Sequence, residues 1–192
     1  MKKSVVFTVL CLGLLFVSHE TWAQQKYFTK SGVIVFDAEG KLDDIEEIKA
    51  KTTTATCVYD EGTGNFEWAV PIKSFVFASS LMQEHFNENY LESSKYPKST
   101  FIGKVEKPSA VNLSKDGTYP VKVNGKLTMH GVTQEVSVDG QFIVQKGVIS
   151  ANSSFDIALK DYKIDIPTVV FMKVADVAKV KVNANLQALK SK

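Results

Sequence analysis

Two histidines and one cysteine carry most of the reactive side-chain chemistry beyond the first 23 residues: His85, His130 and Cys57. A histidine can exchange a proton or bind a metal ion near neutral pH, and a thiolate can act as a nucleophile. His85 stands three residues before Glu88, so a helix would let both side chains face one metal ion. Such a site would need more ligands, and the sequence has no HExxH motif. We expect no metal and no cofactor.

His130 lies in "GKLTMHGVTQEVSV", between two stretches that alternate apolar and polar residues like strands with one buried face. Histidine tolerates unusual turn angles, so we predict that His130-Gly131 only turns the chain. Cys57 lies in the β-branched stretch "TTTATCVY" and has no basic partner nearby in the sequence. The sequence also lacks a G-x-S-x-G elbow and a glycine-rich phosphate loop. These observations predict a protein that is not an enzyme.

The sequence predicts strands for almost the whole chain, and these strands are expected to position the residues named above. Strand-like patterns occur in "SGVIVFDA", "KTTTATCVY", "FEWAVPI", "FIGKVEK", "YPVKVNGKLTM", "QEVSVDGQFIV", "VISANSSFDIAL" and "AKVKVNANLQAL", while "LDDIEEIKA" indicates an acidic turn or a short helical piece. Asp139-Gly140 resembles a hairpin turn, but Lys146-Gly147 offers another a few residues later. We therefore interpret Gly140 as a bulge or bend in one long strand.

One segment, "SSLMQEHFNENYLESSKY", has the pattern of a helix. Ser79 or Ser80 can cap it, and the residues that recur at helical spacing are Leu81, Met82, His85, Phe86 and Asn89. One short helix among seven to nine long antiparallel strands predicts an all-β fold, a closed barrel that leaves no exposed sheet edges.

Residues 1–23 have the features of a signal peptide: a basic start, an apolar run and a small residue, Ala23, at the end. Residues 24–192 are then expected to form one exported domain. No later stretch is long and apolar enough to insert stably into a membrane. The whole chain has a net charge of +2 and contains no arginine, so it lacks the basic face that nucleic acids require.

Apolar and aromatic side chains follow one face of strand after strand. They either fill a solid core or line a pocket, and periodicity does not separate the two. The residues predicted to line a pocket are Phe66, Trp68, Val70, Phe86, Tyr90, Phe101, Leu127, Met129, Val136, Val138, Phe142, Phe155 and Ile157. His85 is the candidate to contact the head group of a ligand.

Three stretches together resemble the YceI-like family of polyisoprenoid-binding-like proteins: "GNFEWAVPIKSFVF", "LMQEHFNENYLESSKYPKSTFIGKV" and "VNGKLTMHGVTQEVSV". The resemblance spans nearly all of the chain after the leader. It implies a lipocalin-like, extended antiparallel β-barrel in the periplasm that encloses a long apolar pocket. The start of the chain, "KSGVIVFDAEGKLDDIEEIKA", departs from the histidine-bearing first strand of the family, which affects the expected ligand rather than the fold.

The expected function is that of a non-enzymatic binder of a long-chain lipid or isoprenoid, periplasmic or secreted. The alternative is an envelope stress or interaction protein with a filled core and no small-molecule ligand. Neither function involves nucleic acid, and both are compatible with a homodimer.

Overall fold

The computed structural model describes residues 25–39, 48–166 and 174–189. Strands make up most of this part of the chain. They are β1 (Lys26–Glu39), β2 (Lys49–Asp60), β3 (Asn65–Pro71), β4 (Val76–Phe77), β5 (Lys98–Val105), β6 (Gly117–Met129), β7 (Val132–Gln145), β8 (Val148–Ala158) and β9 (Val174–Ala188).

Short helical segments lie between the strands. The α-helix α1 (Ser80–His85) continues as the π-helical turn η2 (Phe86–Tyr90), and the 3-10 turns are η1 (Ile72–Ser74), η3 (Pro108–Ala110) and η4 (Leu159–Tyr162). The Ser79 Oγ accepts a hydrogen bond from the Met82 N–H at 3.4 Å and so caps α1, as the sequence indicated. None of the helices in the described ranges is long and apolar enough to cross a bilayer.

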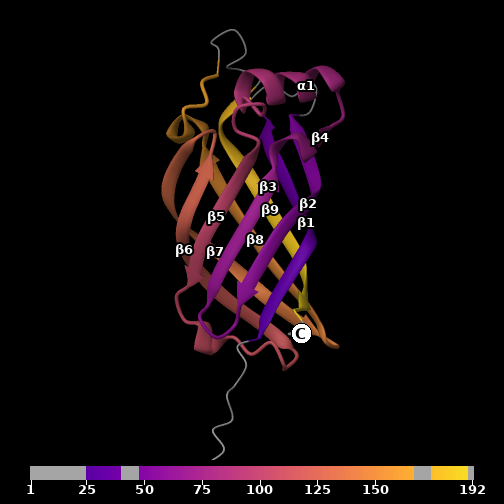
Figure 1. Ribbon diagram of the computed structural model, residues 1–192, viewed down its shortest axis with the longest axis vertical. Coiled ribbons are helices and arrows are strands. Elements are labelled where there is room, and N and C mark those ends of the chain that lie inside the picture. Colours follow the sequence, from indigo (N-terminus) through magenta and orange to yellow (C-terminus); the bar gives the residue numbers. More distant parts are fainter. Residues whose placement is uncertain (1–24, 40–47, 167–173, 190–192) are drawn as a thin grey trace, which may run out of the picture.

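Eight strands close into a barrel whose strands pair in the order β1-β9-β8-β7-β6-β5-β3-β2 and back to β1 (Figure 1). All of these pairs are antiparallel, and β4 adds a short pairing to β2. The predicted all-β, lipocalin-like barrel with one short inserted helix is therefore confirmed. Closure comes from β1 and β2, whose register shifts around Gly32.

The lower end of the barrel, opposite α1 in Figure 1, holds a second cluster of buried side chains around Tyr59. Its centre is formed by three rings, with Tyr59 lying 4.8 Å from Phe142 and 5.2 Å from Phe66 between ring centroids. The Tyr59 side chain is fully buried, and this burial raises its pKa to about 12. Its hydroxyl has no hydrogen-bond partner among the described residues.

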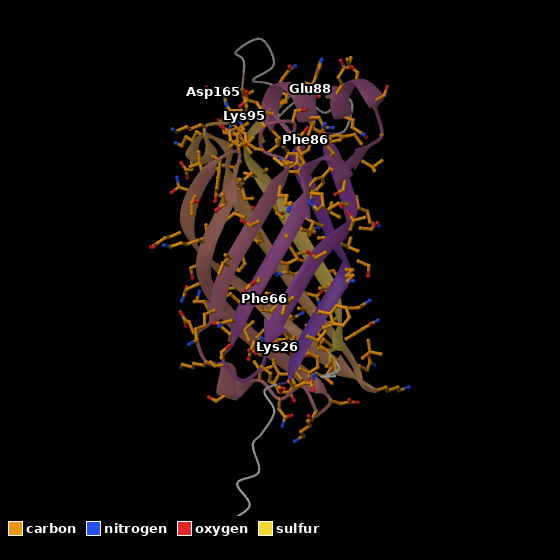
Figure 2. All side chains as sticks on the ribbon, viewed as in Figure 1. Lys26, Phe66, Phe86, Glu88, Lys95 and Asp165 are labelled. Carbon is orange, nitrogen blue, oxygen red and sulfur yellow. The ribbon has the colours of Figure 1, made fainter. Side chains whose placement is uncertain are left out.

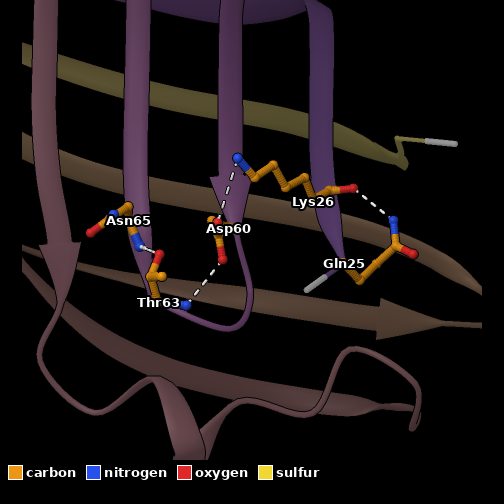
Figure 3. Close-up of polar contacts among 5 residues, drawn as sticks. All are labelled: Gln25, Lys26, Asp60, Thr63 and Asn65. Carbon is orange, nitrogen blue, oxygen red and sulfur yellow. Dashed lines mark hydrogen bonds and ion pairs between the residues drawn. The ribbon is translucent and has the colours of Figure 1, made fainter. Parts of the chain in front are cut away.

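Polar contacts join β1 and β2 at this end of the barrel (Figure 3). The Lys26 Nζ lies 3.7 Å from the Asp60 Oδ2, and the Asp60 Oδ1 accepts a hydrogen bond from the Thr63 N–H at 3.0 Å. The turn at "DEGTGN" begins with the last residue of β2, Asp60, because a short side chain can accept a hydrogen bond from the backbone a few residues later.

The strand β7 runs through Gly140 without interruption, and the chain turns at Lys146-Gly147. The prediction of one long strand through Gly140 is therefore confirmed, while its register with β6 passes Gly140 without the predicted bulge. The acidic segment "LDDIEEIKA" falls mostly in residues 40–47, and the leader falls in residues 1–24, so both expectations concern residues outside the described ranges.

The helix differs from the sequence pattern on one point. Leu81 is 57% exposed and Asn89 is also exposed, although both share helical spacing with Phe86. The α-helix lasts only six residues before it widens into the π-helical turn, so the period of 3.6 residues does not continue to Asn89.

Candidate functional site

The barrel encloses an apolar cavity of about 250 Å³ that reaches from α1 and η2 down to Phe66 and Phe142. For comparison, an engineered apolar cavity of about 150 Å³ stays dry and binds benzene. All thirteen residues predicted to line a pocket lie on its wall, and so does His85. The barrel is therefore hollow between α1 and the cluster around Tyr59. Contact of these residues with a ligand stays a prediction.

The floor of the cavity is aromatic. Trp68 packs against Phe66 with ring centroids 6.0 Å apart, and Trp68 and Phe101 both border the cluster around Tyr59 and the cavity. The indole extends across to β1, where a Cβ on Gly32 would lie 2.8 Å from its ring. Glycine at this position leaves room for the tryptophan. Figure 2 places Phe66 well below Phe86, which marks the opposite end of the cavity.

The roof of the cavity is formed by α1 and η2. Phe86 is buried against three rings, with centroid distances of 5.8 Å to Phe36, 5.6 Å to Phe75 and 5.0 Å to Phe77. Met82, His85 and Tyr90 complete the roof. Burial raises the pKa of the Tyr90 hydroxyl.

His85 and Glu88 do not meet as a metal site would require. His85 is half-buried on the cavity wall, whereas the Glu88 side chain is exposed on the outer side of the helical segment (Figure 2). Within residues 25–39, 48–166 and 174–189, no three His, Cys, Asp or Glu side chains are grouped so that they could hold a metal ion.

Cys57 is buried in β2 at 1% exposure, and burial raises the pKa of its thiol. The thiolate form that a nucleophile needs is therefore strongly disfavoured.

Sequence reasoning missed a large share of the cavity wall. The missed apolar residues include Ile34, Phe36, Phe75, Phe77, Leu91, Val121, Val123, Val180 and Val182. Alternation in β1 and β9 already placed Ile34, Phe36, Val180 and Val182 on apolar faces, so the signal was present. The polar members Ser99, Thr100, Asn152 and Ser153 had no recognisable sequence signal, because isolated polar residues in a strand usually face solvent.

His130 does more than turn the chain. Its φ of +51° and that of Gly131, +72°, confirm the predicted hairpin turn. However, the His130 Nδ1 lies 2.9 Å from the Tyr162 carbonyl oxygen, and its Nε2 lies 3.1 Å from the Glu92 Oε2. The predicted turn is therefore confirmed, and the side chain also links it to two distant segments, which the sequence did not predict. Both partners accept hydrogen bonds, so the ring donates to both when it carries two protons.

Replacing His130 with asparagine should lower the free energy of unfolding by about 1–3 kcal/mol, because it removes one charge-assisted contact and the donor to the Tyr162 carbonyl. Asparagine tolerates the same backbone angles, so the turn itself should persist. Lys146→Asn is the matched control, since Lys146 has the same φ of +51° before Gly147 and an exposed side chain. Urea unfolding of the two variants checks this, and equal losses of stability would contradict it.

Comparison with known proteins agrees with this geometry. The chain matches the YceI-like domain model over residues 18–188. Among solved structures, a polyisoprenoid binding domain from Saccharophagus degradans has a TM-score of 0.73 at 14% identity, over 86% of this chain and 99% of that one. BcnA of Burkholderia cenocepacia has a TM-score of 0.64 at 14% identity, over 81% and 96% of the two chains.

A YceI protein of Campylobacter jejuni has a TM-score of 0.55 at 18% identity, over 79% of this chain and 90% of that one. A search of curated proteins gives no match. At these identities the solved structures support the fold alone, whereas the domain model covers most of the sequence. This chain is therefore a member of the YceI-like family.

Proposed function

We propose that this protein is a non-enzymatic binding protein that holds the apolar chain of a lipid or isoprenoid inside its barrel. The observation that carries the proposal is the apolar cavity of about 250 Å³ between the aromatic floor and the helical roof. An empty cavity of this kind lowers the stability of the folded protein, because the residues that line it lose van der Waals contacts. A ligand that fills the cavity restores them. The polyisoprenoid-binding description of the Saccharophagus degradans domain supports a ligand of this chemistry.

Burial supplies the affinity. Each methylene group moved from water to the cavity contributes about 0.8 kcal/mol, so a long polyisoprenoid or fatty-acyl chain binds without a charged clamp. This agrees with the absence of arginine from the sequence. His85 and Tyr90 are the candidates to contact a hydroxyl or another polar group that lies inside the cavity, since both belong to its roof.

Organic extraction of the purified protein should release a long-chain lipid that mass spectrometry detects. Addition of a fatty acid or an isoprenoid alcohol to the stripped protein should then change the fluorescence of Trp68 saturably, because this indole lies on the cavity floor. Trp68 is the sole tryptophan after residue 23, so the signal has one source. If extraction yields no lipid and Trp68 responds to no amphiphile, the alternative of an envelope interaction protein without a ligand is favoured.

We also propose that the protein is exported to the periplasm. The basic start, the apolar run and Ala23 support cleavage before Gln24. N-terminal sequencing of protein from the cell envelope tests this, and a retained Met1 would contradict it.

A further inference from the structure

The barrel wall is not hydrogen-bonded along its whole height. The ladder between β7 and β8 joins Gly140–Gln145 of one strand to Val148–Ser153 of the other and ends there. Above this point β7 continues to pair with β6 as far as Val132, and β8 continues to pair with β9 as far as Ala158. No ladder therefore joins residues 132–139 to residues 154–158 in the described part of the chain. We call this unpaired part of the wall the slot.

The slot has defined ends. At its lower end the Ser153 Oγ donates to the Asp139 carbonyl oxygen at 2.7 Å. At its upper end the Gln134 Nε2 donates to the Asp161 carbonyl oxygen at 2.8 Å, and His130 contacts the Tyr162 carbonyl. Side-chain contacts thus bridge the two sides of the wall where backbone pairing is absent.

The edges of the slot are apolar on the inside. Val136 and Val138 of β7 and Phe155 and Ile157 of β8 line the cavity, and all four are only partly buried. Two small residues, Gly140 and Ser153, face each other where the ladder ends. An apolar chain that passes between the two strands would therefore contact hydrocarbon on both sides.

A shallow groove on the outer surface adjoins the same place. It is lined by Val33, Val35, Asp139, Gly140, Gln141, Asn152, Ser153, Ser154, Lys181, Val182 and Asn183. Five of these residues, namely Gly140, Gln141, Asn152, Ser153 and Val182, also line the cavity, so only this thin part of the wall separates groove from cavity. The groove also carries charge. Asp139 is paired with Lys122 at 2.8 Å, whereas no ion pair of Lys181 occurs among the described residues.

Both ends of the barrel carry packed aromatic side chains among the described residues. Phe86 packs against three aromatic rings in the roof, and the three-ring core of Tyr59, Phe66 and Phe142 fills the lower end. Opening either end would separate buried aromatic pairs. Widening the slot would break side-chain hydrogen bonds but no backbone ladder.

We propose, on the basis of the proposed function, that the slot between β7 and β8 is a lateral opening through which the chain of a single-chain amphiphile enters the cavity, leaving its anionic head in the outer groove beside Lys181. The head chemistry is a carboxylate or a phosphate, since either would pair with an exposed lysine.

A reversible cross-link across the slot tests the route. Ser137→Cys and Asp156→Cys are exposed positions that would face each other if the β7–β8 register continued upward. A short bis-thiosulfonate reagent would join them through bonds that a reductant cleaves. The buried Cys57 should not react, and the protein used begins at Gln24 and so lacks Cys11. Uptake of hexadecanoate, followed by stopped-flow fluorescence of Trp68, should slow at least ten-fold and recover on reduction.

Ile143→Cys with Ser150→Cys is the matched control, because these residues are paired within the lower ladder of the same two strands. Its cross-link should change the uptake rate less than two-fold. An unchanged rate in the cross-linked slot variant, while the unlinked protein binds normally, would overturn the lateral route and leave the proposed function intact. If the unlinked protein binds no probe, the proposed function is wrong, and the proposed entry route through the slot is wrong with it.

Lys181→Gln tests the position of the head. This variant should bind hexadecanoate and a C15 isoprenyl phosphate about two- to five-fold more weakly, as expected for one exposed ion pair. Its affinity for hexadecanol, which has no charge, should be unchanged. Lys104→Gln on the outer face of β5 is the control and should affect none of the three probes. If His85→Gln weakens the anionic probes and Lys181→Gln does not, the head lies under the roof and its placement in the groove is wrong.

Discussion

Replacing Phe142 with alanine should lower the free energy of unfolding by about 3–5 kcal/mol. Phe142 is 1% exposed, and its ring lies 4.8 Å from that of Tyr59 and 5.9 Å from that of Phe66 between centroids. Phe142 forms part of the cavity floor, and alanine would remove its contacts with both rings and leave a void there. Urea unfolding followed by circular dichroism measures the loss.

Phe155→Ala is the matched comparison for this prediction. Phe142 and Phe155 both line the cavity, but Phe155 is only partly buried, so its removal mainly enlarges a space that already exists. We expect a loss of about 1–2 kcal/mol in the protein stripped of ligand. Equal losses for the two variants would contradict this difference in packing between Phe142 and Phe155.

Val136→Phe should weaken equilibrium binding of a fatty acid by roughly thirty-fold. Val136 lines the cavity, and the larger ring would occupy the space of two to three methylene groups of a bound chain. At about 0.8 kcal/mol for each methylene, the loss is about 2 kcal/mol. Titration of the stripped protein monitored by Trp68 fluorescence gives the dissociation constants.

Ser137→Phe is the control for the added ring, because Ser137 is the next residue on β7 and is exposed on the outer face. Its affinity should stay within two-fold of that of the unmodified protein. If Val136→Phe binds as tightly as the unmodified protein and is folded, the chain does not occupy the upper cavity. The readout is an equilibrium constant, so a change in the width of the slot, which alters rates, does not affect the conclusion.

The sequence by itself determined the elements and their inward faces. Alternation in "FEWAVPI", "GKLTM" and "QEVSV" identified residues that the structure places on the cavity wall, because side chains of a strand point to opposite faces at every step. The hairpin at His130-Gly131 and a helix cap at Ser79 or Ser80 were also predicted from the sequence, and the structure places the cap at Ser79. Each depends on a few consecutive residues, whose preferred backbone angles and local hydrogen bonds are set by residue type.

Only the tertiary structure decided how tightly each inward-facing side chain is packed. Phe142 and Phe155 follow the same alternating pattern and both line the cavity, yet Phe142 is 1% exposed and packs against Tyr59 and Phe66, whereas Phe155 is only partly buried. The same holds for His130, whose partners Glu92 and Tyr162 stand 38 and 32 residues away. The sequence also did not predict that the β7–β8 ladder ends at Gly140 and Ser153. Packing, long-range hydrogen bonds and strand pairing depend on how segments far apart in the sequence meet when the barrel closes. The alternation of residues within one strand carries no information about which distant segment that strand meets.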